Sequence, residues 1–153
     1  MGRGKKPEAT HTWLVMLRAL QAVHHLALPP ILKAGLGDLD FRVLVVLLHK
    51  GPMPVNAIGP KVDLNPGSVS VAVDRLYKKG LVARVESESD RRVRTVSLTE
   101  KGRRVFVPIF RQNAALIQRA FQVISPEEQR QMEELLERIA RRAEELGEQE
   151  GHG

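Results

Sequence analysis

The stretch from Leu64 to Gly102 most constrains the fold, because it reads as a helix followed at once by a β-hairpin and the start of a second helix. Asn65 is a favourable N-cap, Pro66 suits the first helical position, and Gly80 supplies a stop signal. Apolar residues recur between them at helical spacing, namely Val69, Ala72, Val73 and Leu76. This pattern predicts an amphipathic helix over residues 66–79.

The other face of this helix carries small residues first and long basic residues later. Small side chains at the N-terminal end allow close approach to base edges, while Lys and Arg further along reach phosphates. This order is typical of a recognition helix in the major groove, although a solvated helix face has a similar composition. The candidate major-groove residues are Asn65, Pro66, Gly67, Ser68, Ser70, Val71 and Arg75, and the candidate DNA-backbone contacts are Lys61, Lys78 and Lys79.

A hairpin is expected directly after the helix, because residues 81–86 and 93–98 are β-prone runs on either side of a polar tip. Arginines crowd the tip, where a long side chain can enter the narrow, electronegative minor groove. The candidate wing residues are Asp90, Arg91, Arg92 and Arg94. A helix followed by a basic-tipped hairpin is a winged helix.

The segments DRLYKKGLVAR, SDRR and SLTEKG, in this order, resemble the multiple antibiotic resistance regulator (MarR) family of winged helix-turn-helix transcription factors. The resemblance implies a mostly α fold of the α+β class, a winged helix-turn-helix with dimerisation helices on both sides. It implies that Arg92 is the minor-groove arginine and that Asp90 holds the wing in shape. It also implies an effector pocket near the first helix, for which the candidates are Trp13, Leu17, His24 and Phe41; Trp13 is otherwise expected in the core.

Further helices are predicted on both sides of this region from apolar spacing and capping signals. The predicted elements are a first helix capped by Thr10 or Thr12 and stopped by Pro29 and Pro30, a helix over 39–50 capped by Asp38, a short helix over 54–61, a helix capped by Thr99 that runs through Ile124 with a bend at Pro108, and a last helix that starts at the Ser125 capping box and ends at Gly147. The short helix, a turn and residues 66–79 make a helix-turn-helix.

The length of 153 residues suits one domain. Its expected parts are a disordered basic tail over 1–9, a dimerisation helix and linker over 10–35, a DNA-binding core over 36–104, C-terminal dimerisation helices over 105–147 and a tail over 148–153. The first helix has little charge on any face, and the last helices have more apolar surface than one small core requires. We therefore expect a homodimer on a pseudopalindromic operator in double-stranded DNA.

The charge is polarised along the chain, whose net charge is +6. Residues 61–104 hold eleven Lys and Arg against six acids, whereas residues 125–150 hold four Arg against nine Glu. Phosphate attracts the first segment and repels the second, which places DNA at the winged helix.

Other classes of function find less support in the sequence. There is no cysteine, Gly-rich phosphate loop, zinc-protease motif or nucleophile elbow, so no catalytic residue, cofactor or thiol sensor is predicted. His24 and His25 diverge on a helix and His49 lies on the next, so a core or interface role is favoured over metal binding. No signal peptide or run of eighteen apolar residues is found, which predicts a cytoplasmic protein without a membrane segment.

The sequence therefore predicts a sequence-specific transcriptional regulator, a repressor released by a phenolic or other aromatic effector. The alternative is an architectural or effector-independent DNA-binding protein. A metal-responsive regulator is the less favoured third possibility.

Overall fold

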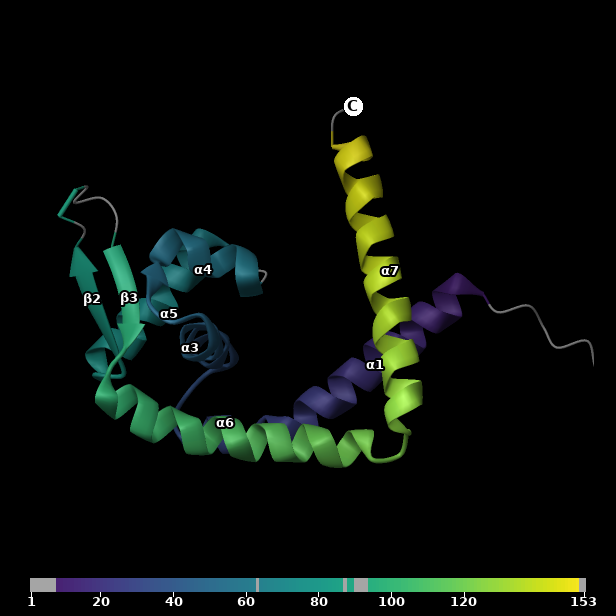
Figure 1. Cartoon of the computed structure of the whole chain (residues 1–153), viewed down its shortest axis with the longest axis horizontal. Coiled ribbons are helices and arrows are strands. Elements are labelled where there is room, and N and C mark those ends of the chain that lie inside the picture. Colours follow the sequence, from purple (N-terminus) through teal and green to yellow (C-terminus); the bar gives the residue numbers. More distant parts are fainter. Residues whose placement is uncertain (1–7, 63, 87, 90–93, 152–153) are drawn as a thin grey trace, which may run out of the picture. The chain divides into compact units, whose positions relative to one another are not determined.

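The computed structural model describes residues 8–62, 64–86, 88–89 and 94–151. Their elements, in chain order, are α1 (Ala9–Ala27), α2 (Pro29–Lys33), α3 (Asp38–Lys50), β1 (Met53–Pro54), α4 (Val55–Val62), α5 (Pro66–Lys78), β2 (Val82–Glu86), β3 (Arg94–Leu98), α6 (Glu100–Phe121) and α7 (Pro126–Glu150) (Figure 1). The chain divides into two compact units, Met1–Ile117 and Gln118–Gly153, which are described separately.

The first unit is built around one hydrophobic core to which α3, α4, α5, the sheet and α6 all contribute. The largest fully buried side chains are Phe106, Leu44, Leu47, Ile58, Leu76, Val43, Val69, Val73, Val82 and Val96. The four residues that were predicted to form the apolar face of α5 are all buried. The mostly helical winged helix-turn-helix fold is thus confirmed, and its core fixes which face of α5 remains outside.

The hairpin predicted after α5 is confirmed, and the structure adds a third strand. The antiparallel sheet has the order β1-β3-β2, with Met53 of β1 opposite Val96 of β3. The sequence instead predicted a helix from Pro54, whereas α4 begins at Val55. A strand of two residues is too short to show an alternating pattern, so its pairing with a distant segment could not be anticipated.

The three strongest capping signals are confirmed. The Asn65 side chain accepts a hydrogen bond from the Ser68 N–H at 2.9 Å. The Thr99 hydroxyl accepts one from the Gly102 N–H at 2.9 Å. At the start of α7 the Ser125 hydroxyl accepts from the Glu128 N–H at 3.2 Å, and the Glu128 carboxylate accepts from the Ser125 N–H at 2.7 Å.

Several predicted helix ends were wrong, and two of them have a local reason. The N-cap of α3 is Gly37 and not Asp38. The Gly37 N–H donates to the carboxylate of Asp40, which stabilises the helix start at this position. The last helix continues through Gly147 to Glu150, since nothing crowds that glycine and no turn requires it. The other differences are that α6 ends at Phe121 and that α5 ends at Lys78, with Lys79 as its C-cap.

The N-terminal segment also differs from the prediction. Helix α1 starts at Ala9 with Glu8 as its N-cap, so Ala9 belongs to the helix and not to a tail. The Thr12 hydroxyl does not cap the helix but donates to the Glu8 carbonyl at 3.4 Å. Pro29 and Pro30 end α1 as predicted, yet they open α2, because the first helical positions need no backbone N–H donor.

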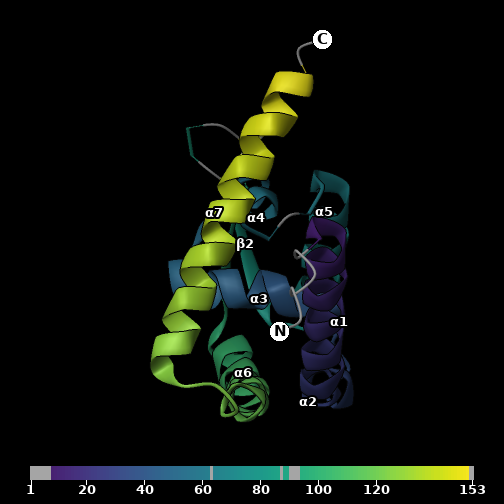
Figure 2. The same cartoon turned by 90° about the vertical axis from the view of Figure 1, so that its right-hand side faces the viewer.

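Helix α1 is followed directly by α2 (Figure 2). Most apolar side chains of α1 are exposed, and Ala27 is its only buried residue. Trp13 is 58% exposed and Leu20 is 68% exposed, so the expectation of a core tryptophan is wrong for the single chain. His24 and His25 are exposed as well. By length and composition alone, the helical segment Ala9–Lys33 could cross a membrane, although Arg18 and the histidines interrupt its apolar residues.

The second unit contains α7, none of whose residues is buried. Four of its apolar residues are exposed and recur at helical spacing, namely Leu135, Leu136, Ile139 and Leu146. Intrahelical ion pairs line its polar side, such as Arg130 with Glu127 at 2.6 Å. The helix is therefore amphipathic, with an apolar face that its own unit leaves uncovered.

Candidate nucleic-acid interface

The outward face of α5 has the order of side-chain sizes that the sequence predicted. Gly67, Ser70 and Val71 are exposed near its N-terminal end, and Lys78 is exposed at its C-terminal end. Asn65 and Pro66 are exposed at its start, whereas Ser68 is only half-buried. The side chains in the N-terminal half of this face are therefore short, which would let the helix backbone approach the edges of base pairs closely.

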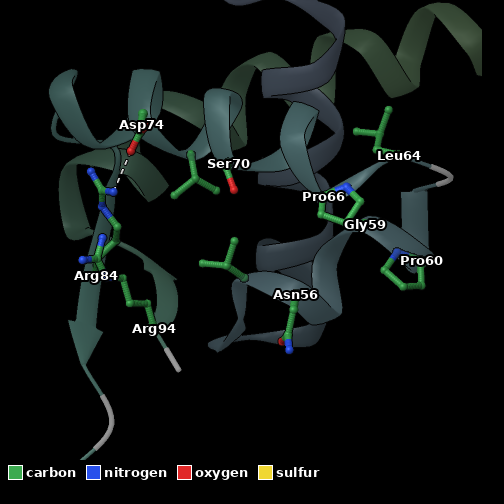
Figure 3. Close-up of a pocket in the computed structure, with 11 residues that line it drawn as sticks. Asn56, Gly59, Pro60, Leu64, Pro66, Ser70, Asp74, Arg84 and Arg94 are labelled. Atoms are coloured by element: carbon green, nitrogen blue, oxygen red, sulfur yellow. Dashed lines mark hydrogen bonds and ion pairs between the residues drawn. The ribbon is translucent and has the colours of Figure 1, made fainter. Parts of the chain in front are cut away.

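A hollow of about 520 Å³ lies beside this face, between α4, α5 and the strands (Figure 3). Asn56 and Pro60 line it from α4, and Ser70 and Asp74 line it from α5. Arg84 of β2 and Arg94 of β3 close its other side. The recognition helix is thus next to an open depression that carries two guanidinium groups.

Arg84 joins the wing to the recognition helix. Its guanidinium donates to the Asp74 carboxylate at 2.6 Å and lies 4.2 Å from the centre of the Tyr77 ring. Arg84 was not among the site residues predicted from the sequence. Strand alternation places Arg84 on the same face as buried Val82. A basic residue on a buried face needs a polar partner, and this pattern could have identified Arg84 from the sequence.

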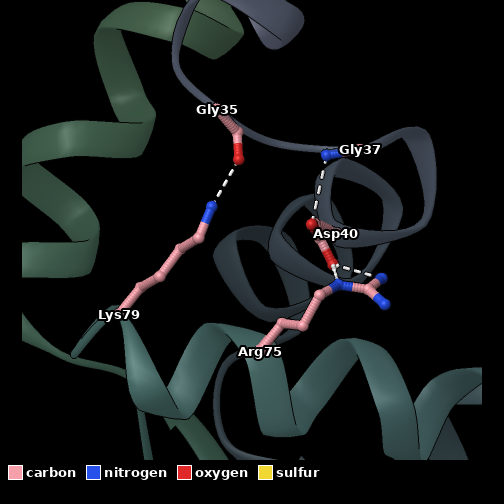
Figure 4. A network of polar contacts seen from close by, with 5 residues as sticks. All are labelled: Gly35, Gly37, Asp40, Arg75 and Lys79. Carbon is pink, nitrogen blue, oxygen red and sulfur yellow. Dashed lines mark hydrogen bonds and ion pairs between the residues drawn. The ribbon is translucent and has the colours of Figure 1, made fainter.

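Two of the predicted DNA contacts, Arg75 and Lys79, have partners within the protein. The Arg75 guanidinium donates to the Asp40 carboxylate through Nε at 3.1 Å and through Nη2 at 2.8 Å (Figure 4). The Lys79 ammonium donates to the carbonyl oxygen of Gly35. The Arg75 side chain thus reaches the first turn of α3 and the Lys79 side chain reaches the turn before it, while both residues remain exposed.

The other predicted cations differ in their surroundings. Lys61 and Lys78 are exposed, and within the described residues neither side chain has a hydrogen bond or an ion pair. Arg94 lies 3.8 Å from the Glu86 carboxylate on the paired strand. Asp90, Arg91 and Arg92, the predicted wing tip, lie outside the described residues.

The four candidate effector residues lie in different environments in the single chain. Trp13 and His24 are exposed, and Leu17 is half-buried. Phe41 packs edge-on against Phe106, with 5.4 Å between ring centres, and so contributes to the core. The hollow beside α5 contains none of the four. Among the described residues no cluster of three or more His, Asp or Glu could hold a metal ion.

Comparison with known proteins gives consistent results. The family model named MarR family matches residues 38–93. The transcriptional regulator MhqR of Bacillus subtilis is 38% identical to this chain over 127 residues, covering 83% of this chain and 88% of MhqR.

Two solved structures share the fold over most of their length. The transcriptional regulator PA4135 matches with a TM-score of 0.75 and 27% identity, covering 89% of this chain and 98% of that chain. NadR in complex with 4-hydroxyphenylacetate matches with a TM-score of 0.71 and 21% identity, covering 92% of this chain and 98% of that chain.

Proposed function

Because the chain belongs to the MarR family of transcriptional regulators that bind DNA, we propose that α5 reads a specific double-stranded site and that the wing contacts the adjacent minor groove. The outward face of α5 carries the proposal, since its small side chains are exposed while its apolar face is fixed in the core. Exposed Lys61 and Lys78 supply phosphate contacts. Arg92 is proposed as the minor-groove arginine, and Arg91 and Arg94 add charge beside it.

The proposed assembly is a homodimer in the cytoplasm. A second copy is the proposed cover for the apolar residues that α1 and α7 expose. A twofold dimer reads a pseudopalindromic operator whose half-sites lie about one helical turn apart, or a multiple of that. Arg18 and two histidines interrupt the apolar segment of α1, which favours a protein partner over lipid.

The proposed regulatory role is repression that a phenolic or other aromatic effector relieves. Occupation of a promoter needs only the DNA-binding surface, so repression requires no further activity from this chain. NadR, which shares the fold, was solved with a phenolic acid, and this supports the class of effector. Trp13, Leu17, His24 and Phe41 remain the proposed pocket residues, in a cavity that a second copy completes.

Selection of bound duplexes from a random pool by the full-length protein tests the core of this proposal. Inverted half-sites about ten base pairs apart are the expected outcome. Log affinity for the selected duplex should fall linearly with log salt, by about 0.9 for each phosphate contact. Unchanged affinity across that salt range, or no enriched sequence, would contradict the assignment.

A titration with phenolic acids separates the two regulatory alternatives. A repressor with an effector releases the selected duplex when 4-hydroxyphenylacetate or a related acid is added, and a Trp13→Ala variant releases it less readily. An architectural or effector-independent protein keeps its DNA affinity throughout the titration.

A further inference from the structure

Asp40 links the start of α3 to the recognition helix. It is 2% exposed, and both of its carboxylate oxygens have partners. Oδ2 accepts from the Gly37 N–H at 3.1 Å, while Oδ1 accepts both hydrogen bonds from Arg75 (Figure 4). A buried carboxylate without a countercharge is strongly unfavourable, so the pairing holds Arg75 at this position although 44% of its side chain is exposed.

Lys79 makes a second contact in the same direction. It follows Arg75 by four residues, so the two side chains project from one side of the helix. The Lys79 ammonium reaches the Gly35 carbonyl in the turn before α3, where Gly35 has a φ of +71°. The Lys79 carbonyl in turn accepts from the Lys101 ammonium of α6 at 2.9 Å.

We propose that Arg75 and Lys79 are positioning residues that fix the orientation of the recognition helix against the start of α3 and the turn before it, and that they do not contact DNA. The proposal rests on the proposed function, because it assigns α5 to base reading. Two attachments one turn apart resist rotation of α5 about its own axis. Such rotation would turn Gly67, Ser70 and Val71 away from the base edges, while the long side chains of the exposed lysines could still reach phosphates.

Adjacent lysines at the end of α5 provide a matched control. Lys79 has an intramolecular partner, whereas Lys78 is exposed and has none within the described residues. The experiment uses the full-length protein and two probes, the duplex enriched by selection and a scrambled duplex of equal length. Affinity for each probe is measured over a series of salt concentrations for wild type and for Arg75→Gln, Lys79→Gln, Asp40→Asn and Lys78→Gln.

We expect the variants to fall into two groups. Lys78→Gln should lose affinity for both duplexes and reduce the salt slope by about 0.9, the value for one phosphate contact. Arg75→Gln and Lys79→Gln should keep the wild-type slope and the affinity for the scrambled duplex. Their affinity for the selected duplex should fall about tenfold, within the range for coupling through a packed network. Asp40→Asn should behave like Arg75→Gln, and a variant that combines Asp40→Asn with Arg75→Gln should lose no more affinity than either single variant.

The results can overturn the positioning role without affecting the proposed function. A reduced salt slope for Arg75→Gln and Lys79→Gln, equal to that of Lys78→Gln, would make both residues phosphate contacts. Wild-type discrimination in both variants would also overturn the proposal. If wild type itself enriches no sequence, the proposed function fails instead. Since Asp40→Asn can weaken the start of α3, thermal unfolding is recorded, and the decision rests on the other two variants.

Discussion

Gly102 lies in the first turn of α6, where a Cβ atom would be 1.9 Å from the carbonyl oxygen of Leu81. Alanine favours helices over glycine, but here the backbone would have to move to accommodate it. We expect Gly102→Ala to destabilise the protein by about 1 to 3 kcal/mol, the usual cost of overpacking. The midpoint and slope of urea unfolding measure this.

Gly147 is the control for this substitution, because it also lies inside a helix but a Cβ atom there would meet no other atom within 4 Å. Gly147→Ala should leave the protein as stable as wild type or stabilise α7 by up to about 1 kcal/mol. Equal losses at Gly102 and Gly147 would show that the close approach to Leu81 has no energetic consequence.

Val71 is 54% exposed on the outward face of α5, among residues that are small or polar. An apolar side chain in the major groove is suited to the 5-methyl group of thymine. We predict that Val71→Ala weakens binding to the selected duplex by about 1 kcal/mol, the contribution of one or two buried methyl groups. Replacing the contacted thymine with deoxyuridine should cause a similar loss in wild type and little further loss in the variant. Additive losses would exclude this contact.

The sequence predicted which residues of α5 face outward better than it predicted their partners. Helical periodicity alone identifies the buried face, because that pattern is local. The partner of Arg75 is 35 residues away, and no spacing rule connects the two positions. Arg75 was therefore assigned to the major groove and Lys79 to the DNA backbone without sight of the intramolecular partner that the fold gives each of them.

At the scale of elements, the capping box of α7 lowers the pKa of a carboxyl group. The pKa of Glu128 lies below its ordinary value, first because the Ser125 N–H donates to the carboxylate and second because of the Ser125 side chain. Because the pKa is lowered, this contact stabilises the start of α7 at pH values above the pKa of Glu128 in the unfolded chain. The stabilisation is lost as the pH falls through the lowered value.

Ser125→Ala should therefore raise the pKa of Glu128 toward its ordinary value, but not fully, since the backbone N–H remains. An NMR titration of the Glu128 carboxyl carbon measures the shift, and Glu128→Gln identifies the resonance. A pKa that is unchanged in Ser125→Ala would mean that the side chain has no part in the interaction.

The capping signals at Asn65, Thr99 and Ser125 were predicted correctly because each involves residues within three positions of one another. Strand β1 was not predicted, because two residues become a strand only through pairing with β3. The N-cap of α3 was misplaced by one residue, because the cap is Gly37, whose N–H donates to the Asp40 carboxylate, and a glycine has no side chain that signals a cap. Elements were therefore predictable where their signals were local.

For the whole molecule, the sequence indicated surplus apolar surface on the first and last helices, and the exposed residues of α1 and α7 agree with this. Hydropathy cannot distinguish a partner chain from lipid, because both cover apolar side chains. The same helix is thus a proposed dimer surface and a segment long and apolar enough to span a membrane. A measurement that reports on α1 itself is needed to distinguish a dimer surface from a membrane segment.

Trp13 provides that observable, since it is the only tryptophan of the chain and is 58% exposed in the single chain. If a second copy covers α1, Trp13 emission should shift to longer wavelength on dilution, over the concentration range in which sedimentation shows dissociation of the dimer. Leu20→Glu places a charge on the same apolar helix. In this variant, the emission shift and the dissociation seen by sedimentation should both occur at higher protein concentration than in wild type. Emission that ignores dilution but shifts to shorter wavelength on addition of phospholipid vesicles would instead assign α1 to a membrane surface.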